Sequence, residues 1–231
     1  MKGVLPETAD ILQKISSFDC IKDYVIMGGT ALSLQIDNRA SEDIDFCKWK
    51  SKKNEKIRID FHLIENELST IGIFKREILA DNEVNYLLNG VKITFFCDNY
   101  YKQPETLKKI KFLNNIMLTD IKTIGIMKLD VMLRRSKFRD YYDIYSLLKA
   151  GVDFNNIVNG VLKYTNHKVR SRDVLSMLSD GNRFSSEENI KHLSPRYDVS
   201  STDIENYLRP YIKNYNQNKK HFKDISFYGP S

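Results

Sequence analysis

The spacing of hydrophobic positions changes about half-way along the chain. In the first half, apolar runs with a period of two, bounded by glycine and polar residues, predict strands at 23–29, 42–49, 73–81, 84–88 and 91–97. A helix is predicted near 61–68, and Asn89-Gly90 predicts a type I′ hairpin turn between the last two strands. This half therefore has the pattern of an antiparallel or mixed sheet with helices.

From Met117 onward, apolar residues recur every three or four positions, as on the buried face of a helix. Asp120 is a candidate cap for the first helix, and Gly151 a candidate stop for the second. The helices predicted by this pattern span 120–135, 139–151, 154–164, 171–178, 185–192 and 203–216. The expected fold is therefore α+β, with a sheet domain at 1–116 and a helical bundle at 117–231.

The composition is that of a globular protein, with 231 residues of which 42% are hydrophobic and 29% charged. No apolar run is long enough to span a membrane, and the first residues carry acids where a signal peptide has an apolar core, so a cytoplasmic location is expected. Three cysteines and four histidines are scattered without the spacing of metal ligands, and we interpret them as structural or surface residues.

Positive charge is concentrated in one part of the chain. Residues 101–150 hold 11 Lys and Arg against 5 Asp and Glu, a difference equal to the whole net charge of +6. One interpretation is a solvated helix face rich in lysine. The other is a surface for phosphate or RNA, on which Tyr100, Tyr101, Tyr141 and Tyr142 could stack against bases.

The stretch "GGTALSLQIDNRASEDIDF" carries the candidate chemistry. Asp43 and Asp45 alternate with apolar residues, so in a strand both carboxylates project to one side. Two carboxylates held close together suit a divalent cation such as Mg²⁺, which can activate an attacking oxygen and stabilise a leaving phosphate. Gly28 and Gly29 allow a tight backbone approach to an anion, and Thr30 begins a helix whose free N–H groups favour phosphate. Each feature alone is common in turns and on strand edges, but their order here is specific.

The same run resembles the signature of the AbiEii/AbiGii toxin family of nucleotidyltransferases, within the DNA polymerase β-like superfamily. A later block, "KLDVMLRRSKFRDYYDIYSLL", is similar to the family's second conserved region, and the resemblance covers most of residues 24–149. It implies a nucleotidyltransferase fold for residues 1–116, followed by a helical domain at 117–231 that contributes Lys128 and Asp143 to the site.

The resemblance also implies a role for each matching residue. Asp43 and Asp45 would bind the metal, Lys128 would hold the triphosphate, and Asp143 would complete the catalytic set. The residues implied to contact the nucleotide are Gly28, Gly29, Thr30, Arg39, Ser41 and Lys128. Simpler interpretations stay open: Lys128 as a surface lysine, and Arg139 with Asp143 as an ion pair along one helix.

One position departs from the superfamily pattern. Related enzymes commonly carry a third carboxylate on a central strand, and the best matching strand here, "VKITFFCD", has Thr94 at the corresponding place. Asp143 could substitute, the nucleotide could hold the second metal, or activity could be reduced.

The function expected from this resemblance is transfer of a nucleoside monophosphate from an NTP to an acceptor, with Mg²⁺ or Mn²⁺ as cofactor. The favoured acceptor is RNA, at the end of tRNA. The protein is expected to act as a toxin and to have a cognate antitoxin as partner. No association with a membrane is expected. Two alternatives remain: a nucleotidyltransferase for small molecules of the antibiotic type, and a catalytically reduced module that binds nucleotide or RNA.

Overall fold

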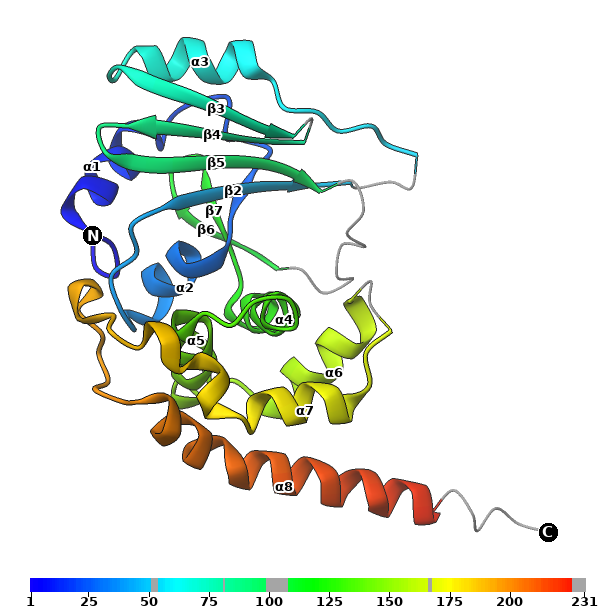
Figure 1. The fold of residues 1–231 in the computed structure, drawn as a ribbon. Helices are drawn as coiled ribbons and strands as arrows, with labels where there is room; N and C mark the ends of the chain where they lie inside the picture. The colour runs from blue at the N-terminus through cyan, green and yellow to red at the C-terminus, as the bar shows by residue number, and fades with distance from the viewer. Residues whose placement is uncertain (51–53, 81, 99–107, 166–167, 226–231) are drawn as a thin grey trace. The chain divides into compact units, whose positions relative to one another are not determined.

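The computed structural model describes residues 1–50, 54–80, 82–98, 108–165 and 168–225, and the chain divides into two units. The first unit holds residues 1–127 and 191–197, and the second holds the remainder. The boundary falls inside helix α4 (Ile121–Met132), which Figure 1 shows in green. The α+β architecture expected from the sequence, a mixed sheet with helices followed by a helical region, is confirmed.

The described part of the first unit is built on a mixed sheet of seven strands in the order β3-β4-β5-β2-β1-β7-β6 (Figure 1). Strand β2 lies at its centre, antiparallel to β1 and parallel to β5. The strands are β1 (Val25–Ile26), β2 (Ile44–Trp49), β3 (Phe74–Ala80), β4 (Glu83–Leu88), β5 (Val91–Asp98), β6 (Lys109–Leu113) and β7 (Ile116–Thr119). Helices α1 (Pro6–Ile15), α2 (Gly28–Ile36) and α3 (Phe61–Ser69) complete the unit with the first part of α4.

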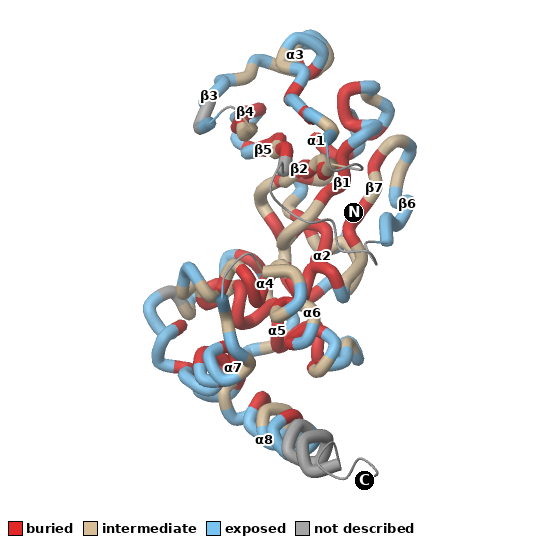
Figure 2. The backbone as a smooth tube through the Cα atoms, turned by 90° about the vertical axis from the view of Figure 1, so that its right-hand side faces the viewer, coloured by how far each residue is buried: buried red, intermediate tan, exposed pale blue. Residues whose placement is uncertain are grey.

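One face of β2 packs into an aromatic core. Ile44 and Phe46 are buried, and the Phe46 ring stacks on Phe95 of β5 with centroids 5.1 Å apart. Tyr24 meets the same two rings edge-on, so aromatic packing fixes the centre of the sheet. Figure 2 shows buried backbone along β1 and β2, whereas β6, at the sheet edge, is mostly exposed. The opposite face of β2 is left for Asp45 and the residues that follow it.

Local sequence signals are confirmed where they fix backbone conformation. Asn89 and Gly90 both have positive φ (50° and 82°), as a type I′ hairpin requires. The Asp120 carboxylate accepts hydrogen bonds from the N–H groups of Lys122 and Thr123, which caps α4. Gly151, with φ 86°, ends the helix that precedes it.

The second unit is helical throughout its described residues. After the end of α4 come α5 (Phe138–Lys149), α6 (Phe154–Tyr164), α7 (Ser171–Leu178), the 3₁₀ segment η1 (Gly181–Glu187) and α8 (Ser201–Ile225). The Tyr141 hydroxyl donates to the carbonyl of Leu178, and the Tyr141 ring stacks on Phe184 with centroids 4.4 Å apart. These contacts join α5 to α7 and η1.

Two predictions need correction, and two elements were not predicted. The α-helix expected at 185–192 is wrong, because η1 and a second 3₁₀ turn, η2 (Lys191–Leu193), occupy this stretch. At Gly181 a Cβ would come within 2.8 Å of the Ser201 carbonyl oxygen, so close packing on α8 determines the path of η1. Helical structure begins at Ile121 rather than Met117, since 116–119 form β7. Helix α1 and strand β6 were not predicted. Among the described residues, no helix has the length and hydropathy to cross a membrane.

Candidate active site

A glycine turn and a carboxylate meet where β1 passes into α2. The Met27 N–H donates to the carbonyl of Asp45 (2.9 Å), which fixes the end of β1 against β2. Gly28 follows with φ 69°, a conformation that favours glycine. A Cβ on Gly28 would stand 3.3 Å from Oδ2 of Asp45, so the backbone of the turn lies directly against this carboxylate.

The loop after α2 returns to the same turn. A Cβ on Gly29 would lie 2.7 Å from Nη2 of Arg39 and 3.3 Å from Oγ of Ser41, so a side chain at this position would displace the Arg39 guanidinium. The Thr30 hydroxyl is hydrogen bonded to Oγ of Ser41 (2.9 Å) and to the backbone carbonyl of Asp43. The structure therefore brings together all five predicted nucleotide contacts that lie between residues 28 and 41.

Arg39 is the cation of this group, and it is 96% buried. Its Nη1 donates to the carbonyl of Ala40 (3.0 Å). A guanidinium beside Gly29, whose neighbour there is Oγ of Ser41, is a group that can bind a phosphate oxygen.

Asp43 and Asp45 flank the buried Ile44, and both are half-buried. No cluster of three or more His, Cys, Asp or Glu side chains suited to a metal occurs among the described residues. Two carboxylates nevertheless fit Mg²⁺ bound together with a nucleotide, since this ion commonly takes one or two carboxylates and completes its shell with phosphate oxygens and water. Asp45 lies beside the glycine turn and Asp43 precedes it by two residues, so these two acids are the candidates for that requirement.

Thr94 occupies the place where related enzymes carry a third carboxylate. It pairs with Asp45 across the parallel strands β2 and β5, and with Asn85 across β5 and β4. The Thr94 hydroxyl donates to Oδ1 of Asn85 (2.9 Å), and both side chains are buried. The sheet beside Asp45 therefore presents a neutral hydrogen-bonded pair instead of an acid.

The later sequence block forms a buried ion-pair cluster in the second unit. Nζ of Lys128 lies 2.7 Å from Oδ1 of Asp140 and 2.7 Å from Oδ2 of Asp143. Both carboxylates are fully buried, and Lys128 is 93% buried. The interpretation of Lys128 as a surface lysine is therefore wrong, and Asp143 pairs with Lys128.

Asp140 was missed as a candidate residue. Arg135 contacts its two carboxylate oxygens at 2.8 and 3.1 Å, so Asp140 joins Lys128 to a second cation. Burial by itself raises the pKa of Asp140, but the interactions with Lys128 and Arg135 outweigh it and hold that pKa below its usual range. The available signal was the spacing of Asp140 and Asp143, three residues apart and so on one helix face.

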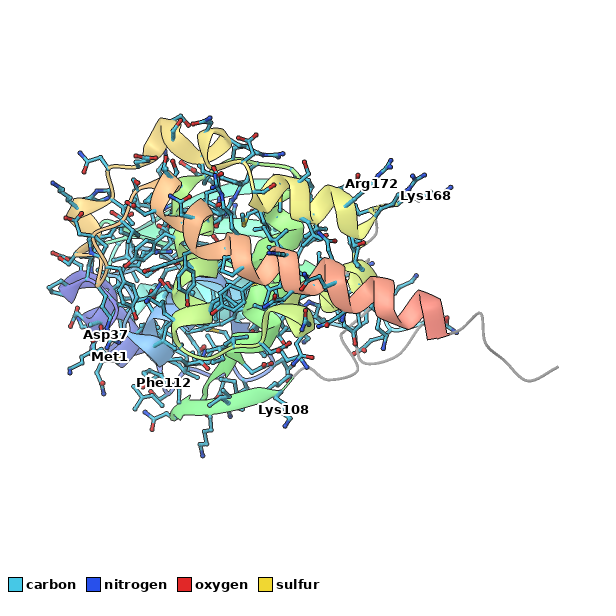
Figure 3. The ribbon with its side chains drawn as sticks, turned by 90° about the horizontal axis from the view of Figure 1, so that it is seen from below. Met1, Asp37, Lys108, Phe112, Lys168 and Arg172 are labelled. Atoms are coloured by element: carbon cyan, nitrogen blue, oxygen red, sulfur yellow. The ribbon has the colours of Figure 1, made fainter. Side chains whose placement is uncertain are left out.

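Two of the four aromatic residues suggested for base stacking can be checked in the described part of the chain. Tyr141 and Tyr142 are fully buried, so this prediction is wrong for both, and Tyr100 and Tyr101 lie outside the described residues. Several lysines of the basic stretch are exposed, among them Lys108, which is labelled in Figure 3. Figure 3 also shows Lys168 and Arg172 projecting from the start of α7, beyond the stretch that holds the charge excess.

Comparison with known proteins places this site in a family. Residues 10–218 match the family described as "Nucleotidyl transferase AbiEii toxin, Type IV TA system". This chain belongs to the AbiEii family. It is accordingly an NTP-using nucleotidyltransferase, which confirms the resemblance seen in the two sequence blocks.

Relatives of this AbiEii protein span nearly its whole length. Uncharacterized protein aq_aa25 of Aquifex aeolicus (strain VF5) is 25% identical over 223 residues, covering 94% of this chain and 100% of that protein. The crystal structure of JHP933 from Helicobacter pylori matches with a TM-score of 0.56 at 17% identity, covering 96% of this chain and 99% of that one. The nucleotidyltransferase toxin MenT4 (Rv2826c) from Mycobacterium tuberculosis H37Rv matches with a TM-score of 0.49 at 13% identity, over 90% of this chain and 91% of its own.

Proposed function

We propose that this protein transfers a nucleoside monophosphate from an NTP to the end of an RNA, with tRNA as the favoured class, in a reaction that depends on Mg²⁺ or Mn²⁺. The observation that carries the proposal is the contact between the glycine turn and a carboxylate. Oδ2 of Asp45 lies 3.3 Å from the Cβ position of Gly28, so a phosphate on the turn and a cation on the carboxylate would be neighbours.

The roles of the residues near the turn follow from their chemistry. Asp43 and Asp45 hold the divalent ion, which when bound supplies charge neutralisation for the triphosphate and for the leaving pyrophosphate. The N–H groups at the start of α2 and the buried Arg39 bind phosphate oxygens. Thr30 and Ser41 keep the loop against the turn through their hydroxyls, which maintains these groups in position.

Lys128 is assigned to the triphosphate. An ammonium has three N–H donors, and Asp140 and Asp143 accept from two of them in the described structure. The carboxylates fix the position of the ammonium and leave one donor for a phosphate oxygen. Asp143 and Asp140 are thus positioning residues for Lys128, and Arg135 holds the Asp140 carboxylate in place.

The toxin assignment and the RNA acceptor rest on family membership and on charge. The family description names a type IV toxin–antitoxin system, so a cognate antitoxin is the proposed partner. The excess of lysine and arginine in residues 101–150 supports a polyanionic acceptor, because aminoglycoside-type substrates are themselves cationic.

Transfer of label tests the proposal. The purified protein is incubated with each α-labelled NTP and Mg²⁺ in three separate arms: total RNA, total protein, and a set of hydroxylated small molecules. The expected result is label in a discrete RNA band, for one NTP above the others. A variant with Asp43→Asn and Asp45→Asn serves as the matched control, since it keeps the size of both side chains.

The arms separate the alternatives. Label on small molecules and none on RNA would overturn the RNA assignment while keeping the transfer chemistry. Equal labelling of RNA by wild type and by the double Asn variant would contradict the assignment of the two carboxylates. Absence of transfer in every arm with NTP bound would contradict the catalytic proposal and point to the neutral Thr94–Asn85 pair as the reason.

A further inference from the structure

The face of the sheet that carries Asp45 continues into an apolar patch. Along β2, Asp45, Cys47 and Trp49 alternate to the same side, and Cys47 and Trp49 are buried with Val25 of β1. Four partly buried hydrophobic side chains pack against these residues: Met27, Phe96, Met117 and Met127. We call Met27, Trp49, Phe96, Met117 and Met127 the apolar patch; all five belong to the first unit.

The patch begins where the phosphate turn begins. Met27 immediately precedes Gly28, and its N–H donates to the carbonyl of Asp45. Phe96 follows Thr94 by two residues on β5 and pairs in register with Cys47 of β2. Trp49 is four residues beyond Asp45, roughly 13 Å along the strand at the usual rise. The patch therefore extends from the turn over the length of a nucleoside.

Trp49 supplies a polar group that lacks a partner. Its ring nitrogen is buried and makes no hydrogen bond to any residue that the structure describes. A buried N–H without an acceptor is unfavourable, and proteins seldom keep one unless another group completes it. Every nucleobase presents ring nitrogens or carbonyl oxygens that accept such a bond.

The side chains of the patch suit a flat heteroaromatic ring. Thioethers of methionine are flexible and polarisable, and they contact aromatic rings favourably. Three methionines and a phenylalanine, each half-buried, thus offer a surface on which a base can stack. The flexible methionine side chains can move aside, so that the base reaches the indole N–H of Trp49.

We propose that the apolar patch binds the base of the incoming NTP, with the Trp49 N–H donating to an acceptor atom on that base. This inference rests on the proposed function, because it takes the glycine turn as the triphosphate site. The NTP is favoured over the RNA acceptor as the source of the base because the patch starts at the residue before the phosphate turn.

Trp49 is the only tryptophan of the chain, so its fluorescence reports on the patch alone. The full-length protein is titrated in Mg²⁺ with a non-hydrolysable NTP, with inorganic tripolyphosphate, and with a short RNA. The expected result is a change in tryptophan emission on adding the NTP. Tripolyphosphate should bind, as measured by calorimetry, and leave the emission unchanged.

Substitutions in the apolar patch test whether it contributes to the affinity for NTP. Phe96→Ala and Met117→Ala should each weaken NTP binding about tenfold, the contribution of one stacked base, and leave tripolyphosphate binding unchanged. Trp49→Phe, which keeps an aromatic ring and removes the N–H, should weaken NTP binding without changing tripolyphosphate binding. Phe112→Ala on β6, which removes an exposed aromatic residue of the same unit, is the control and should change neither.

The outcomes distinguish this inference from the proposed function. If NTP and tripolyphosphate bind equally well to wild type and to the Ala variants, the patch only packs the fold and the inference is overturned while the phosphate site stands. A change in emission caused by RNA and not by NTP would also overturn it. If neither NTP nor tripolyphosphate binds the wild-type protein, the proposed function fails, and the inference fails with it.

Discussion

Two pairs of aspartates in this protein have similar spacing in sequence and opposite surroundings. Asp43 and Asp45 lie two residues apart at the start of β2, and both are half-buried. We call them the strand pair. Asp140 and Asp143 lie three apart on α5, are fully buried, and share Lys128 at 2.7 Å. The first pair is accessible to a cation supplied from solution. The second pair has its cation within the chain, and its charge is compensated before any ligand arrives.

The difference shows that a pair of acids does not by itself define a metal site. Burial with a lysine makes the helix pair part of the packing, where removing one partner leaves an uncompensated charge. The strand pair is only half-buried and lies beside a glycine turn, where a bound cation would relieve the repulsion between the two carboxylates. Activity and stability should therefore respond separately to substitutions at the two pairs.

The largest expected effect is on catalysis at the strand pair. Asp43→Asn or Asp45→Asn should lower the rate of nucleotide transfer by about 10³-fold, the size of a major electrostatic contribution to catalysis. The melting temperature should change by less than about 2 °C, because neither side chain is fully buried. Steady-state transfer rates and calorimetric melting of the same samples test both parts. A large loss of stability with unchanged transfer would reverse the assignment of the two pairs.

At the helix pair the main effect should be on stability. Lys128→Ala leaves two buried carboxylates without their shared cation and should cost about 3–5 kcal/mol of unfolding free energy. Urea unfolding followed by circular dichroism measures this loss. Lys122→Ala, which removes an exposed lysine of the same helix α4, should change the free energy by less than about 0.5 kcal/mol. Equal losses at the two lysines would show that the buried cluster contributes no special stability.

Gly28 and Gly90 both have positive φ, so substituting each in turn distinguishes the effect of backbone strain from a specific effect on the reaction. Gly28→Ala and Gly90→Ala should each cost about 1–2 kcal/mol from backbone strain. Only at Gly28 does the new Cβ come within 3.3 Å of Asp45, whereas at Gly90 nothing lies within 4 Å. Transfer should fall about 10²-fold for Gly28→Ala alone, as expected for a small misplacement of a catalytic group. Equal transfer rates in the two variants would show that the glycine turn has no part in the reaction.

The smallest effect concerns the pH dependence of stability. The pKa of Asp140 is lowered in the folded state, so its ionisation stabilises the fold above its unfolded pKa of about 3.9 and this contribution is lost as the pH falls through the folded value. Asp140→Asn should flatten the decline of unfolding free energy below pH about 4. Asp10→Asn, at an exposed ion pair with Lys14, should leave the decline unchanged. Identical pH profiles for wild type and Asp140→Asn would contradict this account of the cluster.

How far the sequence predicts this structure depends on whether the deciding interaction is local. The hairpin at Asn89-Gly90 and the cap at Asp120 were predictable because the residues themselves dictate the backbone. The stretch 185–192 was not, since its path follows from the contact of Gly181 with α8, about twenty residues away. Strand β6 escaped prediction because its alternating lysines and apolar residues are exposed on both faces, as suits a sheet edge.

The candidate site shows the same division. The run from Gly28 to Asp45 is continuous in sequence, and the structure brings its predicted nucleotide contacts together around one turn. Burial of Lys128 and its pairing with Asp140 depend on helix packing that spacing alone does not reveal. Burial likewise removes Tyr141 and Tyr142 from any base-stacking role, although their position in a basic stretch favoured one.

The central claim is that the strand carboxylates hold the divalent ion that accompanies the nucleotide. Calorimetric titration of a non-hydrolysable NTP, with and without Mg²⁺, tests this claim in the wild type and in the Asp45→Asn and Asp143→Asn variants. The account predicts that Mg²⁺ strengthens NTP binding to the wild type and to Asp143→Asn, and that this strengthening is lost in Asp45→Asn. An equal benefit from Mg²⁺ in all three proteins would contradict it.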